Sequence, residues 1–224
     1  LRLNYNGNLN FTFADLSDYN LMNSAEKLEF ERLAGYYGDL DVNGEIVSEG
    51  YQQLYYQRLA EVKRGVDTYW MSEPLRFATS HSHNLFAEGG DDRMRYGIGF
   101  SYNKTQGVMK GSDRDVLNGN VRLMYRYKTV AFTNYLNLDY TMSSRENVSF
   151  SEFSRANPYH RKLNEYGEPD QVMETYTDSD INSSSYLKTL NVYNPLYDMI
   201  LNSSNESRSF GFRNNFEIDW RVYD

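Results

Sequence analysis

The sequence lacks several features that define common classes of protein. None of its 224 residues is a cysteine, so a disulfide framework and thiolate chemistry are excluded. No run approaches 18 apolar residues, which excludes a transmembrane helix. Acidic residues outnumber basic ones, and the formal net charge is −8. Because nucleic-acid binding requires clustered Lys and Arg, nucleic acid is not expected as a partner.

What the chain does contain is aromatic side chains, which make up 16% of its residues and include 21 tyrosines. That content is high for an ordinary soluble domain. The mean hydropathy is −0.74, which still allows a membrane protein of one kind. A barrel strand is apolar on one side only, so its average is hydrophilic. The composition therefore excludes helical membrane proteins and leaves β-barrels open.

A strict alternation of apolar and polar side chains runs from Phe210 to Val222. Successive side chains of a strand point to opposite faces, so this segment is predicted to be a strand with one apolar and one polar face. It is longer than the usual soluble strand of about 5–6 residues, and it suits the roughly 9–11 residues that cross an outer membrane. Similar alternation recurs along the chain, and strands are predicted near 1–13, 82–89, 93–103, 115–127, 129–142 and 208–222.

The connections between these segments differ in length. Gly89–Asp92 and Lys128–Thr129 are tight turns, whereas the loops 14–81 and 143–207 are long. Short periplasmic turns that alternate with long outer loops are typical of an up-and-down membrane barrel. The first long loop is predicted to contain two short helices, one opened by a capping box at Asn23–Glu26 and one running from Ser48 towards Gly65.

These observations predict an all-β fold. Residues 1–224 are expected to form one partial domain, a transmembrane antiparallel up-and-down β-barrel portion of about six strands with short helices in its first long loop. Six strands cannot close a barrel whose smallest single-chain relatives have eight. The chain also starts and ends within strands, so we expect it to be a piece of a larger protein.

The polar face of the predicted strands is expected to face an aqueous lumen. Asn is a poor strand former, so its repeated use on one face indicates a wet or hydrogen-bonded surface. One interpretation is that this surface lines a substrate path. The other is that it only faces the water of the lumen or hydrogen-bonds to a plug. The candidate lumen-facing residues are Arg2, Asn4, Asn6, Asn8, Asn118, Asn120, Arg122, Arg213, Asn215 and Glu217.

Aromatic side chains near the strand ends lie on the predicted apolar face. Amphipathic rings at headgroup depth form the aromatic girdles of membrane barrels, and ordinary packing in a soluble sheet is the alternative. The candidate girdle residues are Tyr102, Tyr125, Tyr127, Tyr140 and Trp220.

Other patterns carry little chemistry. Asp178–Asn182 resembles the opening of a calcium loop, but the glycine and the later glutamate of such loops are missing. His81, His83 and His160 do not show metal-ligand spacing beyond one His-x-His pair. Neither a Gly-x-Ser-x-Gly motif nor an assignable carboxylate pair is present. We therefore expect no enzyme activity, no cofactor and no metal site.

Four segments resemble the early barrel of the SusC/RagA family of TonB-dependent transporters: His83–Gly107, Leu21–Lys27, Ser151–Tyr159 and Asn194–Asp198. The resemblance implies the N-terminal part of a 22-stranded outer-membrane barrel of Bacteroidetes-type bacteria. Such barrels take up oligosaccharides, or in some members peptides, beneath a SusD-like lipoprotein lid, and TonB energises them. The TonB box, the plug domain and the C-terminal barrel of the family have no counterpart in this sequence.

The sequence thus predicts TonB-dependent nutrient import across the cell outer membrane. The expected cargo is an oligosaccharide, with peptide as the alternative. Expected partners are the lipid bilayer, a SusD-like surface lipoprotein, and TonB through the missing N-terminal part. Two further hypotheses remain open: a soluble carbohydrate-binding β-sandwich, whose apolar face would pack on a second sheet, and a purely structural barrel without transport.

Overall fold

The computed structural model describes residues 1–146, 148–178, 188–201 and 205–222. The chain folds as two compact units, each assembled from separate stretches of sequence. The sheet unit comprises Leu1–Ala14, Arg76–Glu146 and Ser204–Asp224, and the loop unit comprises Asp15–Leu75 and Asn147–Ser203. The two long connections of the sequence therefore fold together rather than as independent loops.

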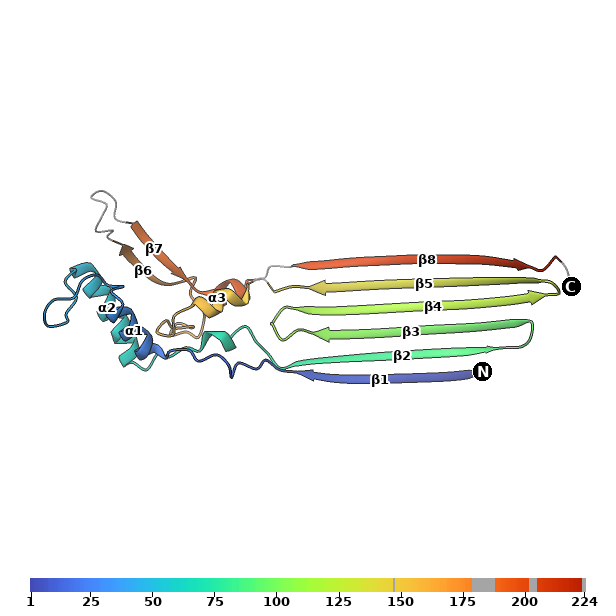
Figure 1. Ribbon diagram of the computed structural model, residues 1–224, viewed down its shortest axis with the longest axis horizontal. Coiled ribbons are helices and arrows are strands. Elements are labelled where there is room, and N and C mark those ends of the chain that lie inside the picture. Colours follow the sequence, from blue (N-terminus) through green and yellow to red (C-terminus); the bar gives the residue numbers. More distant parts are fainter. Residues whose placement is uncertain (147, 179–187, 202–204, 223–224) are drawn as a thin grey trace. The chain divides into compact units, whose positions relative to one another are not determined.

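The sheet unit is one antiparallel sheet with the strand order β1-β2-β3-β4-β5-β8 (Figure 1). Each strand pairs with its neighbour in an unbroken register, so the sheet has up-and-down topology. Within the described residues it is open, with β1 and β8 at its edges. Its strands are β1 (Arg2–Thr12), β2 (Ala78–Gly90), β3 (Met94–Gln106), β4 (Asp113–Tyr127), β5 (Val130–Ser144) and β8 (Glu206–Trp220).

Two tight turns join strands at one end of the sheet, which we call the turn end; the opposite end is the loop end. Between β2 and β3, Asp91 accepts hydrogen bonds from the backbone N–H groups of Arg93 and Met94. Between β4 and β5, Lys128 has a φ of 51°, the left-handed conformation that two-residue hairpin turns require. Side-chain capping and backbone conformation thus fix both predicted turns.

The loop unit begins with two helices. Helix α1 (Ser24–Leu33) starts with the predicted capping box, in which Asn23 and Glu26 each accept a backbone N–H of the other. Helix α2 (Glu49–Lys63) follows Ser48, whose side chain makes no capping hydrogen bond. A short 3-10 helix, η1, spans Trp70–Ser72. None of the described helices is long and apolar enough to cross a membrane.

The second long connection is more structured than the sequence predicted. Residues 143–207 were expected to be a loop, yet they contain α3 (Phe150–Arg155), the hairpin β6 (Val172–Asp178) and β7 (Lys188–Tyr193), and α4 (Pro195–Ile200). The hairpin is short and bulged between Val172 and Glu174, so its alternation is weak. Met173 and Tyr176 instead pack on the two cores of the loop unit, and this tertiary packing is invisible to a local pattern.

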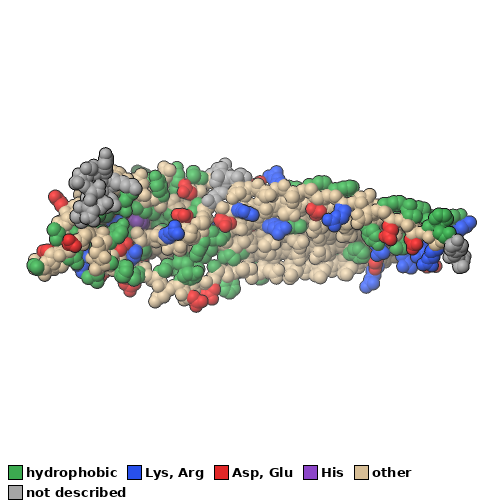
Figure 2. Space-filling view, turned by 45° about the horizontal axis from the view of Figure 1, so that its top comes forward, with side chains coloured by type: hydrophobic (Ala, Val, Ile, Leu, Met, Phe, Trp, Pro, Cys, Tyr) green, Lys and Arg blue, Asp and Glu red, His purple; other side chains and the backbone are tan. Residues whose placement is uncertain are grey.

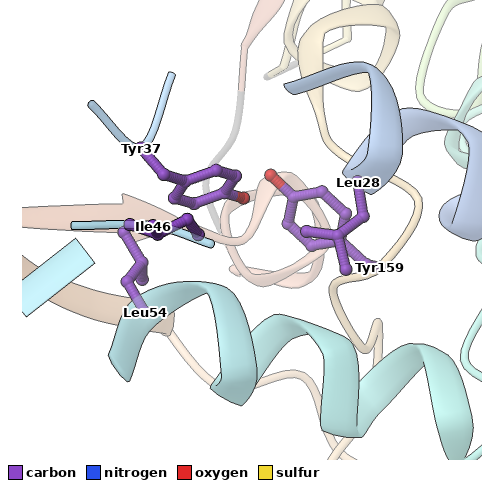
Figure 3. Packing of buried hydrophobic residues seen from close by; sticks show 5 residues of the cluster. All are labelled: Leu28, Tyr37, Ile46, Leu54 and Tyr159. Atoms are coloured by element: carbon purple, nitrogen blue, oxygen red, sulfur yellow. The ribbon is translucent and has the colours of Figure 1, made fainter. Parts of the chain in front are cut away.

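Buried aromatic side chains build the two cores of the loop unit. The first core consists of Leu28, Tyr37, Ile46, Leu54 and Tyr159. Figure 3 shows that the hydroxyl groups of Tyr37 and Tyr159 point toward one another in this core. The second core consists of Trp70, Val148, Phe153 and Leu196. Both cores join residues from the two long connections, which explains why these connections form one unit.

A buried ion-pair network lies beside the first core. The Arg58 guanidinium is only 3% exposed and binds Glu174, with 2.7 Å between Nη2 and Oε2. It also donates to the Tyr37 hydroxyl at 2.9 Å. That hydroxyl and the hydroxyl of Tyr159 both donate to Glu31. Arg58 of α2 thereby links α1 to the β6 hairpin.

Tyrosine rings surround the same guanidinium. The rings of Tyr36, Tyr37, Tyr159 and Tyr176 lie with their centroids 5.0–5.6 Å from Arg58 Cζ. Cation–π attraction is stronger where the cation has lost its water, as it has here. The rings therefore compensate part of the cost of burying the charge.

The network sets the protonation states of its members. Burial alone would raise the pKa of Glu174, but hydrogen bonds from His160 and Arg58 outweigh it and lower the pKa from 4.5 to about 2. Burial raises the pKa of the Tyr37 and Tyr159 hydroxyls. Glu174 is consequently ionised and both tyrosines are neutral donors at neutral pH.

We predict that Arg58→Leu opens the loop unit. Loss of one partner leaves Glu174 and Glu31 as buried charges, which costs roughly 3–5 kcal/mol. Proteolysis within residues 15–75 and 147–203, performed on the folded full-length protein, measures this opening. The matched control is Arg64→Leu, because Arg64 is exposed and pairs with Glu61 on the surface, where a pair contributes at most about 1 kcal/mol. Equal sensitivity of the two variants would contradict the assigned role of Arg58.

A second prediction concerns acid. The pKa of Glu174 is lower in the folded state, so its ionised form stabilises the loop unit above about pH 4.5, and this contribution is lost as pH falls towards 2. The denaturant midpoint of the loop unit should therefore fall between pH 4.5 and 2. In Glu174→Gln the midpoint should start lower and lose this part of its pH dependence. Glu165→Gln at an exposed position is the control, and an unchanged acid profile in Glu174→Gln would refute the prediction.

Candidate functional site

The unbroken register of the sheet aligns side chains from all six strands in rows. One row consists of Tyr5, Leu85, Phe100, Gly119, Leu138 and Phe212, and the next of Leu3, Ala87, Ile98, Val121, Leu136 and Asn214. These rows lie on one side of the sheet, which we call the apolar face. Many of its side chains are exposed, including Leu9 at 57% and Phe212 at 65%. A contiguous exposed apolar surface of this size marks contact with a membrane or another protein.

The apolar band crosses the strands obliquely. On β1 it reaches Phe11, close to the loop end, whereas on β8 it begins with Phe210 and continues to Trp220 at the turn end. In the row that contains Leu9 of β1, the β8 residue is already Arg208. When strands are tilted, an apolar band at constant height falls at different residue positions in successive strands, as it does here.

The structure places the candidate girdle residues in two groups. Tyr102 and Tyr140 share one row, separated by Leu117 of the strand between them. Tyr125, Tyr127 and Trp220 lie at the turn end, where Tyr127 and Trp220 flank Val130 in one row. The two groups therefore lie at opposite ends of the apolar band on β3, β4, β5 and β8.

The register places the candidate lumen-facing residues together on the opposite side, the polar face. One of its rows runs from Arg2 through Arg122 to Asn215, the next from Asn4 through Asn120 to Arg213, and a third from Asn6 through Asn118. Asn8 extends this pattern towards the loop end and Glu217 towards the turn end. Asn84, Ser101, Asn103 and Thr141 were not among the candidates, although their alternate positions in β2, β3 and β5 place them on this face.

The polar face has two chemically different zones. The zone towards the loop end, which we call the neutral zone, carries mostly amides and hydroxyls: Asn6, Asn8, Asn10, Ser80, Ser82, Asn84, Ser101, Asn103, Thr105, Asn118, Thr141, Ser143, Ser207 and Ser209. Asp139 and Arg114 are charged residues in the same rows. The zone towards the turn end is charged and includes Arg2, Glu88, Arg95, Arg122, Arg213 and Glu217. In Figure 2 the middle of the sheet is largely tan with some blue and red side chains, and more of these charged side chains gather towards its far end.

Three glycines on the polar face are covered by side chains of neighbouring strands. A Cβ at Gly99 would lie 2.5 Å from the Asn120 amide, and one at Gly97 would lie 3.1 Å from the Phe86 ring. Asp139 covers Gly211 in the same manner. Glycine inside a strand is unfavourable unless something approaches the backbone closely. Here the side chains of Phe86, Asn120 and Asp139 lie flat over the backbone of the sheet instead of projecting from it.

Two of the cavities in the loop unit involve segments or side chains already described. One of about 470 Å³ lies beside the ion-pair network and is lined in part by Arg58, His160 and Glu174. The other, of about 620 Å³, is lined by residues of Leu21–Lys27 and Ser151–Tyr159. Two segments that the sequence analysis singled out, far apart in the chain, therefore border the same cavity.

No group of three or more potential metal ligands occurs among the described residues. The calcium-like segment Asp178–Asn182 lies outside the residues whose side chains are described. His160 takes part in the ion-pair network, with 3.3 Å between Nε2 and Oε2 of Glu174, and His81 and His83 lie next to one another on β2.

Comparison with known proteins supports the fold. No protein-family model and no curated protein matches the chain. It is similar to a solved structure titled the RagAB peptide importer in the closed-closed state, with a TM-score of 0.66 and 14% identity over 99% of this chain. A structure of the RagAB peptide transporter gives 0.64 and 12% over 96%. In both cases the chain spans 26% of the matched chain, so it has the fold of about a quarter of a transporter chain.

Cysteine labelling can test the two faces, because this chain has no cysteine of its own. Asn137 and Leu138 are neighbours on β5 that point to opposite faces. In the full-length protein in lipid vesicles, a water-soluble maleimide should label Asn137→Cys and leave Leu138→Cys largely unlabelled. Detergent solubilisation is not expected to change the labelling of Asn137→Cys. Rapid labelling of Leu138→Cys in vesicles would show that the apolar face is open to water.

Proposed function

We propose that this chain is part of the barrel of an outer-membrane, TonB-dependent transporter of the SusC/RagA type, and that the parent protein imports a nutrient oligomer. The observation that carries the proposal is the two-faced sheet, which is apolar and exposed on one side and polar on the other. Its similarity to part of the RagAB chains supports a transporter fold. Residues 1–224 would supply six strands of a closed barrel of about 22 strands.

The dimensions of the apolar band support a membrane location. Phe210 and Trp220 lie ten positions apart on β8, which corresponds to about 33 Å along a strand. On a strand tilted by roughly 40°, this length spans about 25 Å, the height of the apolar band of an outer-membrane barrel. The oblique course of the band across the strands fits such a tilt, and the two tyrosine groups would lie at the two interfaces.

The soluble-sandwich hypothesis is not supported. A sandwich must cover its apolar face with a second sheet. The other described sheet, β6 and β7, has strands of seven and six residues, whereas the strands of the large sheet have 11–15. A hairpin of that size cannot cover six long strands.

The neutral zone favours an oligosaccharide as cargo. Asn amides can donate and accept hydrogen bonds simultaneously, as the hydroxyl groups of a sugar also do. Neutral hydrogen-bonding groups, which outnumber the charged Asp139 and Arg114 in these rows, suit a neutral, hydroxyl-rich ligand. Peptide is the second candidate, because the matched structures are named peptide importers. A SusD-like lipoprotein and TonB are the partners that the proposal includes.

Uptake of labelled oligosaccharides and labelled peptides, by cells that carry the full-length protein or lack it, tests the proposal. Asn118→Leu in the neutral zone should reduce oligosaccharide uptake roughly five- to tenfold, the equivalent of one lost hydrogen bond. The control Asn134→Leu makes the same substitution on the apolar face of β5 and should leave uptake unchanged. If the cells take up the peptide but not the oligosaccharide, the cargo is a peptide. If uptake of both is the same with and without the protein, the proposed transport function is refuted.

A further inference from the structure

A polar cluster interrupts the apolar face of the sheet on β2. On that face of β2, His83 and His81 occupy the next two positions from Leu85 towards the loop end. Their ring centroids are 5.1 Å apart. The hydroxyl of Tyr5 lies 2.7 Å from His83 Nδ1, and the Tyr102 ring lies 5.7 Å from His81. Four residues of three adjacent strands thus meet at one place on the apolar face, which elsewhere carries the hydrogen-bonded pair Asn134 and Asn214.

Two charged residues continue the cluster. Lys104 is the cross-strand partner of His81, and Asp115 is the cross-strand partner of Lys104. Asp115 accepts a hydrogen bond of 2.7 Å from the Tyr102 hydroxyl. Lys104 makes no hydrogen bond or ion pair with any residue that the structure describes, and Nδ1 of His81 is buried with no hydrogen-bond partner. The cluster therefore contains a cation and a ring nitrogen with unfilled hydrogen-bonding capacity.

The cluster lies inside the apolar band, close to its edge at the loop end. Leu9 of β1 lies in the same row as His81 and Lys104. Nearer the loop end, the rings of Phe11 and Phe77 stack with their centroids 5.7 Å apart. Ionisable groups on a membrane-facing surface are costly and rare. A lysine near the edge of the band can extend its ammonium to headgroup depth.

We propose that Lys104, His81 and His83 bind the phosphate of an anionic lipid in the leaflet at the loop end. Phosphate is an acceptor-rich anion, so it suits an unpaired ammonium and imidazole N–H groups. The apolar surroundings select a ligand that arrives within the bilayer, because its acyl chains can lie along Leu85 and Phe100. This inference rests on the proposed membrane barrel.

The test uses the full-length protein in phosphatidylcholine nanodiscs that contain a minor fraction of phosphatidic acid, and native mass spectrometry counts the retained lipids. Wild-type protein should retain phosphatidic acid in preference to phosphatidylcholine. Lys104→Gln should reduce this preference about fivefold, the equivalent of about 1 kcal/mol for one basic group at a lipid surface. His81→Gln should also reduce it, because it removes an imidazole hydrogen-bond donor. Lys104→Arg should restore it.

Two controls identify the site and the source of the phosphate. Arg208→Gln removes a cation from the same row, four strands from His81, where Arg208 already pairs with Glu206, and it should have no effect. Excess inorganic phosphate should not displace the lipid. Equal retention by wild type and Lys104→Gln, or displacement by free phosphate, would overturn the lipid site alone. Failure of the protein to enter nanodiscs would refute the membrane barrel as well.

Discussion

The unbroken backbone pairing of the six strands is the constraint on which the sheet unit depends. Side chains alternate with a period of two, so a slip of one residue in any strand would move its apolar side chains to the polar face. The register from β1 to β8 contains no such slip within the described residues. Both the apolar band and the neutral zone follow from it, because each is made of contributions from every strand.

A different interaction organises the loop unit. The two long connections share two apolar cores, and beside the first core they are also joined by one buried cation with two carboxylates and a set of tyrosines around it. Such an arrangement is directional, unlike apolar packing, because Arg58 can satisfy Glu174, Glu31 and Tyr37 together in only one geometry. The many tyrosines of the sequence thus occupy two settings, the strands of the sheet and the surroundings of a buried charge in the loops.

The sequence was sufficient for the sheet and insufficient for the loops, and the reason is physical. The strand from Phe210 to Trp220 could be predicted from its own residues, because the alternation of apolar and polar side chains is a local pattern. The start of the first helix could also be predicted locally, from the capping box of Asn23 and Glu26. The hairpin of β6 and β7 could not, because Met173 and Tyr176 are positioned by cores that involve residues far away in the chain. The Arg58 network has the same origin, with Glu174 lying 116 positions after its partner.

The polar face also showed a limit of local patterns. Alternation identified Asn118 and Asn120 as members of that face, but it could not distinguish a side chain that projects from one that lies flat. Only the pairing of Asn120 with Gly99 and of Asp139 with Gly211 reveals the difference. The same holds for the polar cluster on β2, where a short and irregular segment of sequence became a defined group of side chains once its neighbours were known.

The covered glycines have a consequence for the size of molecule that can pass. Where Phe86, Asn120 and Asp139 lie against the backbone, the inner radius of the proposed barrel is set by the main chain rather than by side-chain tips. Any residue larger than glycine at position 97, 99 or 211 would lift the covering side chain inward and narrow the bore at that height. The exclusion limit of such a barrel could therefore change through single glycine substitutions, without altering the number or the tilt of its strands.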